Sequence, residues 1–322
     1  MIVTLKVGVW NDVRYGFAAD AERLGVDSLW SPEAWAFDAF TPLAYVAAQT
    51  ETVRLGTAIA QLGARTPPML AMTALSMQVL THDRFVLGLG TSGPQVMEGW
   101  HGVAFDKPIQ RTRETIETVR AITSGEKVGK IRSPLAPKHV PIHVAALGPA
   151  NLRLTGELAD GWIGNSFVPE HADVFFDPMK EAGRFDELDI TVAVGVEITD
   201  DEDVISRHAR GYAFAFGAMG SKEHNFYVDA FARQGYEDDV KAVQQLWLDG
   251  KRDEAAARVP LEIGEKTNLL GTPEMIKARL RLYRDCGVTT LRAGLPRERD
   301  LDTLAQLLDL VREVNGEPSV PS

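Results

Sequence analysis

The stretch RLGTAIAQLGARTPP, residues 54–68, decides the fold. Its first seven residues are mostly apolar or small, a pattern typical of a strand that is buried on both faces. Residues 63–65 then break the run, Thr66 is a favourable helix N-cap, and Pro67 suits the first helical position. The stretch therefore predicts a buried strand that leads directly into a capped helix, and it raises the question of what lies against the small residues where that strand ends.

The same strand-then-helix pattern recurs along the chain. Short apolar runs alternate with amphipathic segments in which apolar residues fall at helical spacing, as in KPIQRTRETIETVRAIT (107–123). Such alternation is typical of βα units that share one parallel sheet. Eight units favour a fold of the α/β class, a closed (β/α)8 TIM barrel, over an open sheet. The strands are expected at residues 5–10, 27–30, 53–60, 84–90, 141–147, 161–166, 190–198 and 288–295.

Residues 211–266 depart from this alternation. They carry helical patterns but no clear strand, so we expect a helical insertion between the seventh and eighth strands of a single domain that spans residues 1–322. The insertion contains GAMGSKEHN (217–225), and it could act either as a lid over the site or as a contact with a second subunit. A shorter stretch, residues 125–140, is rich in Gly, Pro and Lys and is expected to be an exposed loop.

The composition excludes several classes of function. A formal net charge of −11 argues against a nucleic-acid surface, because phosphate backbones attract clustered Lys and Arg. No apolar stretch approaches the roughly 20 residues that span a bilayer, and the N-terminus lacks a signal-peptide pattern, so we expect a cytoplasmic protein with no membrane span. The seven histidines are scattered, which predicts no metal site. The single cysteine, Cys286, is expected to be a buried thiol.

In a barrel of this kind the active site lies in the loops after the C-terminal ends of the strands. Two of these loops are rich in small residues. GLGTSG (88–93) lets the backbone approach a ligand closely and present N–H groups to a phosphate, whereas its third glycine is misplaced for a dinucleotide fingerprint. In ALGPAN (146–151), Pro149 begins a helix whose N-terminus could face an anion.

Four segments resemble a known family. RLGTAIAQLGARTPPMLA (54–71), RFVLGLGTSGPQVMEGWHGV (84–103), PIHVAALGPANLRLTGELADGW (141–162) and GAMGSKEHNFY (217–227) resemble the luciferase-like flavoenzyme superfamily, and more narrowly its branch that uses the deazaflavin coenzyme F420. The resemblance covers nearly the whole chain and implies the barrel that the strand pattern predicts. It also implies that a bent deazaisoalloxazine ring lies at the strand ends, backed by a non-prolyl cis peptide that matches Ala58–Ile59 here.

The resemblance assigns further residues to the cofactor. Small Thr57 and Ala58 would leave room for the ring, and Ile59 would press on its middle. The residues expected to bind the cofactor are Ala34 and Trp35 beside the ring, Ala58 and Ile59 behind it, Thr91, Ser92 and Gly93 along it, and Ala145, Ala146, Leu147 and Gly148 on the ribityl-phosphate side.

The sequence departs from relatives at two of these places. Glu33 and Ala34 stand where relatives often have an Asp-His pair, so a mechanism that needs a histidine is not available at Ala34. Gly93 stands where members acting on sugar phosphates have a glutamate, which disfavours a sugar-phosphate dehydrogenase. The first βα loop is also short, because Asn11 follows directly after Trp10, and this predicts a pocket with one open wall.

Together these features imply a coenzyme F420-dependent oxidoreductase that transfers a hydride between the deazaflavin C5 and a small organic substrate. Glu33 is the candidate catalytic residue for proton transfer, although a helix-capping or salt-bridging role stays open. His101, His143 and Arg65 are weaker candidates for the site.

Two other functions remain open. One is a flavin mononucleotide (FMN)-dependent monooxygenase of the same superfamily, and the other is a non-catalytic flavin- or deazaflavin-binding protein. Trp35 and Trp100 are expected either to wall the pocket or to pack in the core. A homodimer is expected because dimers are common in the family.

Overall fold

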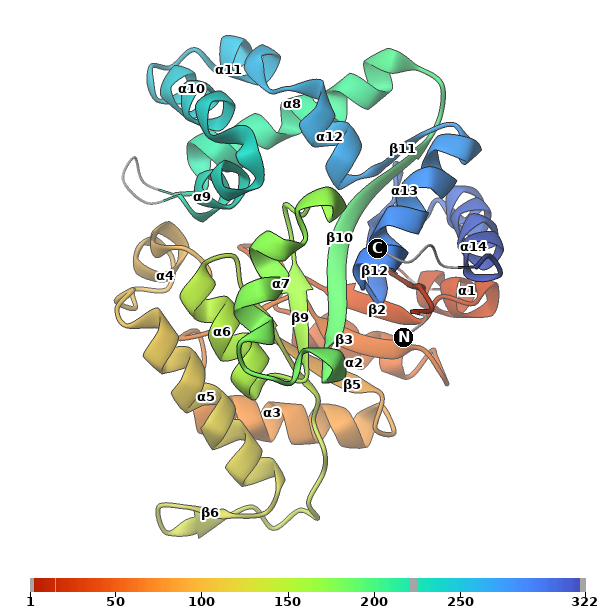
Figure 1. The fold of residues 1–322 in the computed structure, drawn as a ribbon. Helices are drawn as coiled ribbons and strands as arrows, with labels where there is room; N and C mark the ends of the chain where they lie inside the picture. The colour runs from red at the N-terminus through yellow and green to blue at the C-terminus, as the bar shows by residue number, and fades with distance from the viewer. Residues whose placement is uncertain (1–2, 15, 221–224, 319–322) are drawn as a thin grey trace.

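Eight parallel strands close into a barrel in the computed structural model, which describes residues 3–14, 16–220 and 225–318 (Figure 1). Each strand pairs with the next, and the ring is completed where the sixth strand pairs with the seventh, the seventh with the eighth, and the eighth with the first. The predicted (β/α)8 barrel is therefore confirmed. Its strands are β1 (Lys6–Trp10), β2 (Ser28–Ser31), β3 (Arg54–Thr57), β5 (Phe85–Gly90), β8 (Ile142–Ala145), β9 (Gly161–Gly164), β10 (Asp189–Ile198) and β12 (Thr290–Gly294).

The third strand is shorter than the sequence predicts. Instead of one strand over residues 53–60, β3 ends at Thr57, and the chain resumes as the two-residue strand β4 (Ala60–Gln61) beside β5. The break coincides with a cis peptide between Ala58 and Ile59. Two other short elements also differ from the prediction: β6 (Lys127–Val128) and β7 (Ile131–Arg132) form an exposed hairpin in the expected loop, and β11 (Leu269–Gly271) pairs with β10.

Helices cover the outside of the barrel because outward-facing strand residues are apolar. Leu55, Leu87 and Leu89 are fully buried in one continuous core with helix residues such as Leu70 and Ile116. The surrounding helices are α1 (Phe17–Leu24), α2 (Phe40–Ala47), α3 (Pro67–Leu80), α4 (Pro94–Gly99), α5 (Pro108–Thr123), α6 (Pro149–Leu158), α7 (Asp173–Lys180), α13 (Pro273–Cys286) and α14 (Leu301–Asn315), with short 3₁₀ turns at η1 (Pro169–His171) and η2 (Phe185–Glu187).

A separate group of helices lies between β10 and β11 in sequence and above the C-terminal ends of the strands in space (Figure 1). It has its own apolar core, which includes Phe216, Phe231 and Val240. The first of its helices is capped by Asp201 and so begins before residue 211. The group comprises α8 (Glu202–Ala218), α9 (Phe226–Phe231), the π-helical turn η3 (Ala232–Tyr236), α10 (Glu237–Leu248), α11 (Arg252–Arg258) and α12 (Leu261–Thr267).

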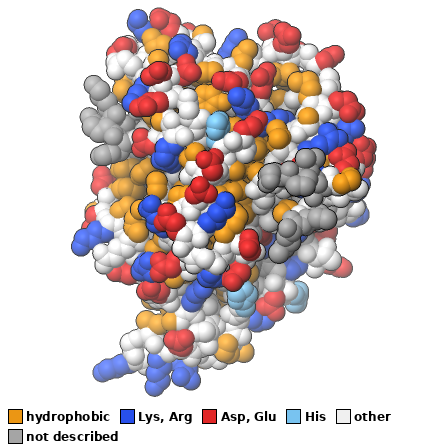
Figure 2. All heavy atoms as spheres, viewed as in Figure 1, with side chains coloured by type: hydrophobic (Ala, Val, Ile, Leu, Met, Phe, Trp, Pro, Cys, Tyr) orange, Lys and Arg blue, Asp and Glu red, His pale blue; other side chains and the backbone are white. Residues whose placement is uncertain are grey.

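Residues 221–224 of the GAMGSKEHN segment lie outside the described residues. No helix in the described part of the chain is long and apolar enough to cross a membrane. Acidic and basic side chains are interspersed over the face shown in Figure 2, with basic side chains gathered at the tip of the β6–β7 hairpin, where Lys127, Lys130 and Arg132 are exposed.

The N-terminal half of the barrel interior is polar. Arg54 Nη1 lies 2.9 Å from Asp189 Oδ2, and His143 Nε2 lies 4.0 Å from the same oxygen. Burial lowers the pKa of His143 to about 4, so the imidazole is neutral at pH 7. His143 is therefore part of the barrel filling and lies among polar groups below the strand ends.

Acidification is expected to destabilise the protein through His143. The pKa in the folded protein is about 4, below the ordinary value of 6.5, so between these pH values the unfolded chain binds the proton and the folded chain does not. The free energy of unfolding should fall by about 3 kcal/mol over this window because of His143 alone. Urea unfolding of the wild-type protein and a His143→Gln variant at several pH values measures the difference. Equal pH dependence in the two proteins would contradict the assignment.

Candidate functional site

An apolar floor closes the barrel at the C-terminal ends of its strands. It consists of Trp10, Trp30, Ala58, Ile59, Val86, Ala145 and Ile163, which pack together inside the barrel. The cis peptide that the resemblance predicts is present at Ala58–Ile59. Gly90 is needed beside it, because a Cβ at Gly90 would lie 2.8 Å from Ile59 Cγ1. The floor is therefore a surface of small and branched side chains that a flat ring could cover.

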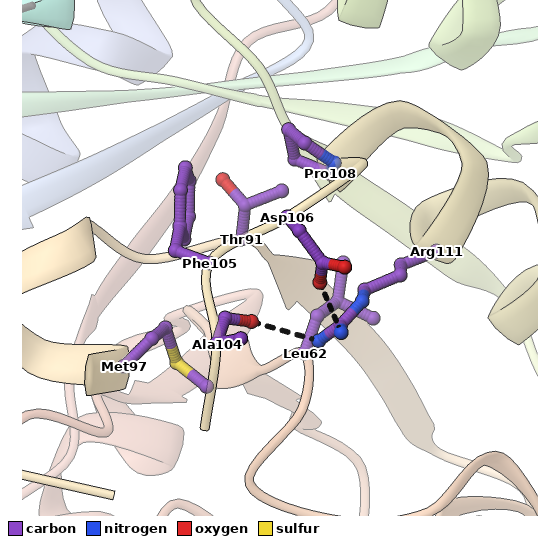
Figure 3. Close-up of a pocket in the computed structure, with 8 residues that line it drawn as sticks. All are labelled: Leu62, Thr91, Met97, Ala104, Phe105, Asp106, Pro108 and Arg111. Atoms are coloured by element: carbon purple, nitrogen blue, oxygen red, sulfur yellow. Dashed lines mark hydrogen bonds and ion pairs between the residues drawn. The ribbon is translucent and has the colours of Figure 1, made fainter. Parts of the chain in front are cut away.

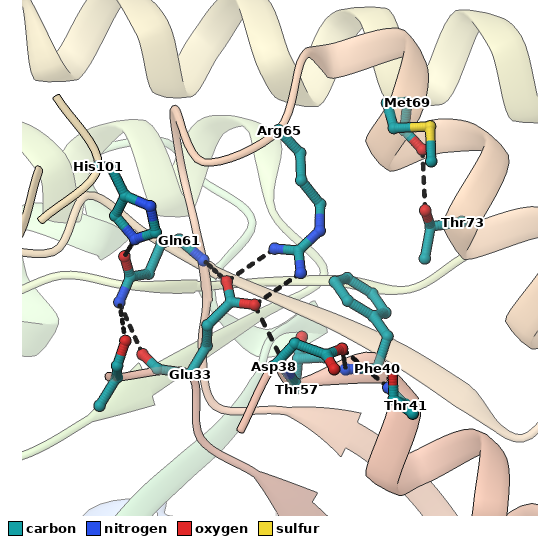
Figure 4. A network of polar contacts seen from close by, with 12 residues as sticks. Glu33, Asp38, Phe40, Thr41, Thr57, Gln61, Arg65, Met69, Thr73 and His101 are labelled. Atoms are coloured by element: carbon teal, nitrogen blue, oxygen red, sulfur yellow. Dashed lines mark hydrogen bonds and ion pairs between the residues drawn. The ribbon is translucent and has the colours of Figure 1, made fainter. Parts of the chain in front are cut away.

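Glu33 lies next to this floor but is occupied by hydrogen-bond donors (Figure 4). Its two oxygens accept from Arg65 Nη1 and Nη2 at 2.8 and 2.7 Å, a bidentate pair. Glu33 also accepts from the backbone N–H of Gln61 at 2.9 Å and of Ala39 at 3.3 Å. The Arg65 guanidinium lies over the Phe40 ring, 4.8 Å from its centre. These contacts favour the salt-bridging alternative for Glu33 over proton transfer.

Gln61 extends this network to a histidine. Its Nε2 donates to the Glu33 carbonyl at 2.8 Å, and its Oε1 lies 2.8 Å from His101 Nε2 (Figure 4). Because Gln61 Oε1 can only accept, the His101 tautomer that fits carries its proton on Nε2. Gln61 was not predicted as a site residue, although it lies within residues 54–68. The available signal was a glutamine directly after an apolar run, and in the structure this glutamine is buried.

The predicted phosphate side is open and lined by backbone. Ser92 has a positive φ of 58°, and the loop of Thr91, Ser92 and Gly93 leads from β5 into α4. Gly148 is the N-cap of α6, no side chain caps that helix, and a Cβ built at Gly148 would meet nothing within 4 Å. The uncapped N-terminus of a ten-residue helix thus faces free space, which suits an anion.

Arg233 brings a positive charge to the same loop. It comes from η3, and its Nη2 donates to the Leu147 carbonyl at 2.5 Å. Its neighbour Gln234 is buried and bonds to the loop after β9, accepting from Val168 N–H and donating to the Ser166 carbonyl, each at 2.9 Å. These two residues connect the helices above the barrel to its strand ends. Neither contact was predicted from the sequence.

The other predicted residues are placed differently. Ala146 is buried, so its side chain does not line open space. Its carbonyl accepts a hydrogen bond from Trp162 Nε1 at 2.9 Å. Trp35 and Trp100 are 59% and 66% exposed, so of the two alternatives left open for them the core-packing one is wrong. The two rings lie in the segments that follow β2 and α4.

A family model for luciferase-like monooxygenases matches residues 13–290. The chain belongs to the luciferase-like monooxygenase family. A Mycobacterium tuberculosis protein named "Putative coenzyme F420-dependent oxidoreductase Rv3520c" is 34% identical over 326 residues, which cover 90% of this chain and 94% of that protein. The 5,10-methylenetetrahydromethanopterin reductase of Methanolobus tindarius is 28% identical over 298 residues, which cover 87% of this chain and 89% of that enzyme.

The barrel also matches solved structures of this family's fold. An F420-dependent secondary alcohol dehydrogenase in complex with an F420–acetone adduct superposes with a TM-score of 0.73 over 98% of this chain and all of that one. The two sequences are 15% identical, so the likeness shows the fold.

Beside the floor, this luciferase-like barrel has a cavity of about 620 Å³. It opens between the ends of β1, β2 and β12, where the first βα loop is short. Its lining includes Trp10, Asn11, Ser31, Ala34 and Gly294.

A second hollow, lined by Leu62, Thr91 and Met97 among others, has a volume of only about 20 Å³ (Figure 3). Arg111 at its edge pairs with Asp106 and donates to the Ala104 carbonyl at 3.1 Å. These contacts hold the segment between α4 and α5 near Thr91. Among the described residues, no three His, Cys, Asp or Glu side chains are grouped so as to hold a metal ion.

Proposed function

We propose that the protein is a coenzyme F420-dependent oxidoreductase that transfers a hydride between the deazaflavin C5 and a carbon atom of a small organic substrate. The observation that carries the proposal is the apolar floor around Ala58–Ile59 beside the open N-terminus of α6, in a chain whose M. tuberculosis relative bears an F420-dependent name. When bound, the deazaflavin supplies the hydride chemistry at its C5 carbon.

The residues fit such a cofactor. The side chains of Ala58, Ile59 and Ala145 present an apolar surface for a flat ring. The loop of Thr91, Ser92 and Gly93 would border that ring. The backbone at Gly148 has the space and the unpaired helix N-terminus that a phosphate needs. Arg233 adds a cation at Leu147. These residues would hold the ring and the phosphate at opposite ends of one site.

The residues around the floor would place the substrate and limit the access of water. The cavity beside Trp10 is the space for a small organic substrate. Glu33 would act as a positioning residue, because its oxygens hold Arg65 and the Gln61 N–H immediately after the floor. His101, fixed through Nε2 by Gln61, is then the better candidate for moving a proton, at Nδ1.

Equilibrium binding of F420 and, separately, of FMN to the purified protein tests the proposal, with ligand fluorescence as the readout. Micromolar or tighter binding of F420 with much weaker binding of FMN is the expected result. Preference for FMN would instead favour the monooxygenase alternative, and binding of neither would overturn the cofactor assignment. Tight F420 binding without hydride exchange across a broad panel of alcohols, ketones and imines would favour a carrier protein.

A homodimer in the cytoplasm is also part of the proposal. Large apolar side chains are exposed on neighbouring helices α2 and α3, where Tyr45, Met69 and Met72 are 49%, 52% and 60% exposed. An apolar surface of this kind is typical of an interface between subunits. Light scattering should give twice the chain mass for the wild type.

A further inference from the structure

Arg292 is a cation enclosed in the barrel. It lies on β12, where its neighbours Leu291 and Ala293 pack outward against the helices, so the Arg292 side chain points inward. Small residues flank it in the sheet, Gly8 on β1 and Ala193 on β10. Its guanidinium carbon lies 4.5 Å from the centre of the Trp10 ring, and only 3% of the residue is exposed. The charge therefore lies directly beneath one of the residues that form the floor.

This cation lacks a counter-charge. Arg292 Nε and Nη1 are buried without a hydrogen-bond partner, and no carboxylate within the described ranges forms an ion pair with it. Arg54, the other arginine inside the barrel, is paired with Asp189 at 2.9 Å. Burial lowers the pKa of Arg292 to about 10, which still leaves the guanidinium protonated at pH 7. An unpaired buried charge disfavours the folded state, so its presence calls for a partner that the chain does not supply.

The surroundings indicate where that partner enters. Trp10 covers the guanidinium and also lines the 620 Å³ cavity. Asn11, the next residue and a member of the same cavity wall, has a buried Oδ1 with no hydrogen-bond partner in the described structure. Unsatisfied polar atoms thus flank Trp10: Asn11 Oδ1 belongs to the cavity wall, and the Arg292 donors lie against the Trp10 ring. An anionic oxygen group of a ligand would accept from the Arg292 donors, and a water bound beside it could donate to Asn11 Oδ1.

We propose that Arg292 is a binding residue for an anionic oxygen group, of the carboxylate type, on a ligand that enters the cavity past Trp10. The inference rests on the proposed function for the identity of that ligand. The same chemistry has two sources there: a carboxylate on the organic substrate, or the carbonyl-bearing edge of the deazaflavin ring, which is negatively charged when the ring is reduced. A planar guanidinium suits either group, because both present oxygen atoms in one plane.

Benzoate, a flat carboxylate, is the probe for the first source. The wild-type protein without cofactor is titrated with benzoate at pH 7.5 and constant ionic strength, with tryptophan fluorescence as the readout and a Trp10→Phe variant to assign the signal. Arg292→Met should weaken benzoate binding at least tenfold, and Arg292→Lys should keep part of it. Arg297→Met removes the same charge from the exposed rim of the same cavity and should change the affinity less than about twofold, because exposed charges are screened.

The second source is tested by the redox dependence of cofactor binding. If Arg292 contacts the ring, Arg292→Met should weaken the binding of reduced F420 at least tenfold more than the binding of oxidised F420. In that case benzoate should bind to neither the wild type nor the variant. In both cases Arg292→Met should raise Tm by about 2 °C or more, because it removes an unpaired buried charge and keeps the packing under Trp10. A structural arginine would give the opposite shift in Tm.

Two results would overturn the inference. One is a folded Arg292→Met protein that binds benzoate and both redox states of F420 as the wild type does. The other is a wild-type protein that binds no benzoate and shows no difference between Arg292→Met and wild type in redox preference. Failure of the proposed function is distinguishable, because a protein that binds benzoate through Arg292 but does not bind F420 keeps the anion site and loses only the cofactor assignment.

Discussion

Replacing Gly148 with leucine is expected to weaken F420 binding at least a hundredfold while lowering the stability of the fold by only about 1 kcal/mol, because leucine is a poor helix N-cap. The backbone there has φ −80° and ψ 146°, which any residue adopts, and a Cβ would meet nothing within 4 Å. The leucine side chain would therefore fill the space at the N-terminus of α6 that the cofactor phosphate needs. A hundredfold change corresponds to about 2.7 kcal/mol of binding free energy. Fluorescence titration measures the affinity, and a thermal melt checks the fold.

Gly211 provides the matched control. It lies in α8, is exposed, and also has nothing within 4 Å of a built Cβ. Gly211→Leu should bind F420 as the wild type does. If Gly148→Leu keeps wild-type affinity, the phosphate does not lie at α6, and the ring placement that depends on it is wrong as well.

A substitution at Arg233 tests how much the positive charge of this site contributes to cofactor binding, apart from the shape of the site. An Arg233→Gln variant keeps a donor near the Leu147 carbonyl but removes the cation, so we expect an affinity loss of about tenfold that shrinks as salt is added. A loss that does not depend on salt would indicate that Arg233 acts by holding η3 on the barrel instead.

The barrel could be predicted because its causes are local. Residues 85–90 are buried on both faces and residues 108–123 carry one apolar stripe, and both patterns are visible in a few neighbouring residues. The cis peptide at Ala58–Ile59 was expected only through the family resemblance, because nothing in the composition of that segment distinguishes it from an ordinary strand end.

The contacts of the site could not be predicted, because barrel closure brings together residues that are far apart in sequence. Glu33 meets Arg65 from 32 positions away, and Arg233 meets Leu147 from 86. The isolation of Arg292 depends on what every neighbouring strand contributes to the interior. For this reason the sequence left two roles open for Glu33, proton transfer and a salt bridge, since a carboxylate at a strand end looks the same whether or not an arginine lies opposite.

Replacing Arg65 with methionine is expected to lower the free energy of unfolding by about 3 kcal/mol. The Glu33 side chain is 7% exposed and that of Arg65 21%, so the variant would leave a buried carboxylate with backbone donors only. Urea unfolding measures the loss. The double variant Glu33→Gln with Arg65→Met should recover part of it, because the unpaired charge is then gone. The stability change of the double variant minus the changes of the two single variants gives the coupling energy.

The same variants decide between the two roles of Glu33. A positioning residue acts through the segment after the floor, so Glu33→Gln and Arg65→Met should weaken F420 binding to a similar extent, with turnover recovering at saturating cofactor. A proton-transfer residue would instead lose turnover in Glu33→Gln at unchanged cofactor affinity, and Arg65→Met would retain it. Because Arg65 carries no transferable proton at neutral pH, equal effects of the two substitutions can arise only through the geometry that the ion pair maintains.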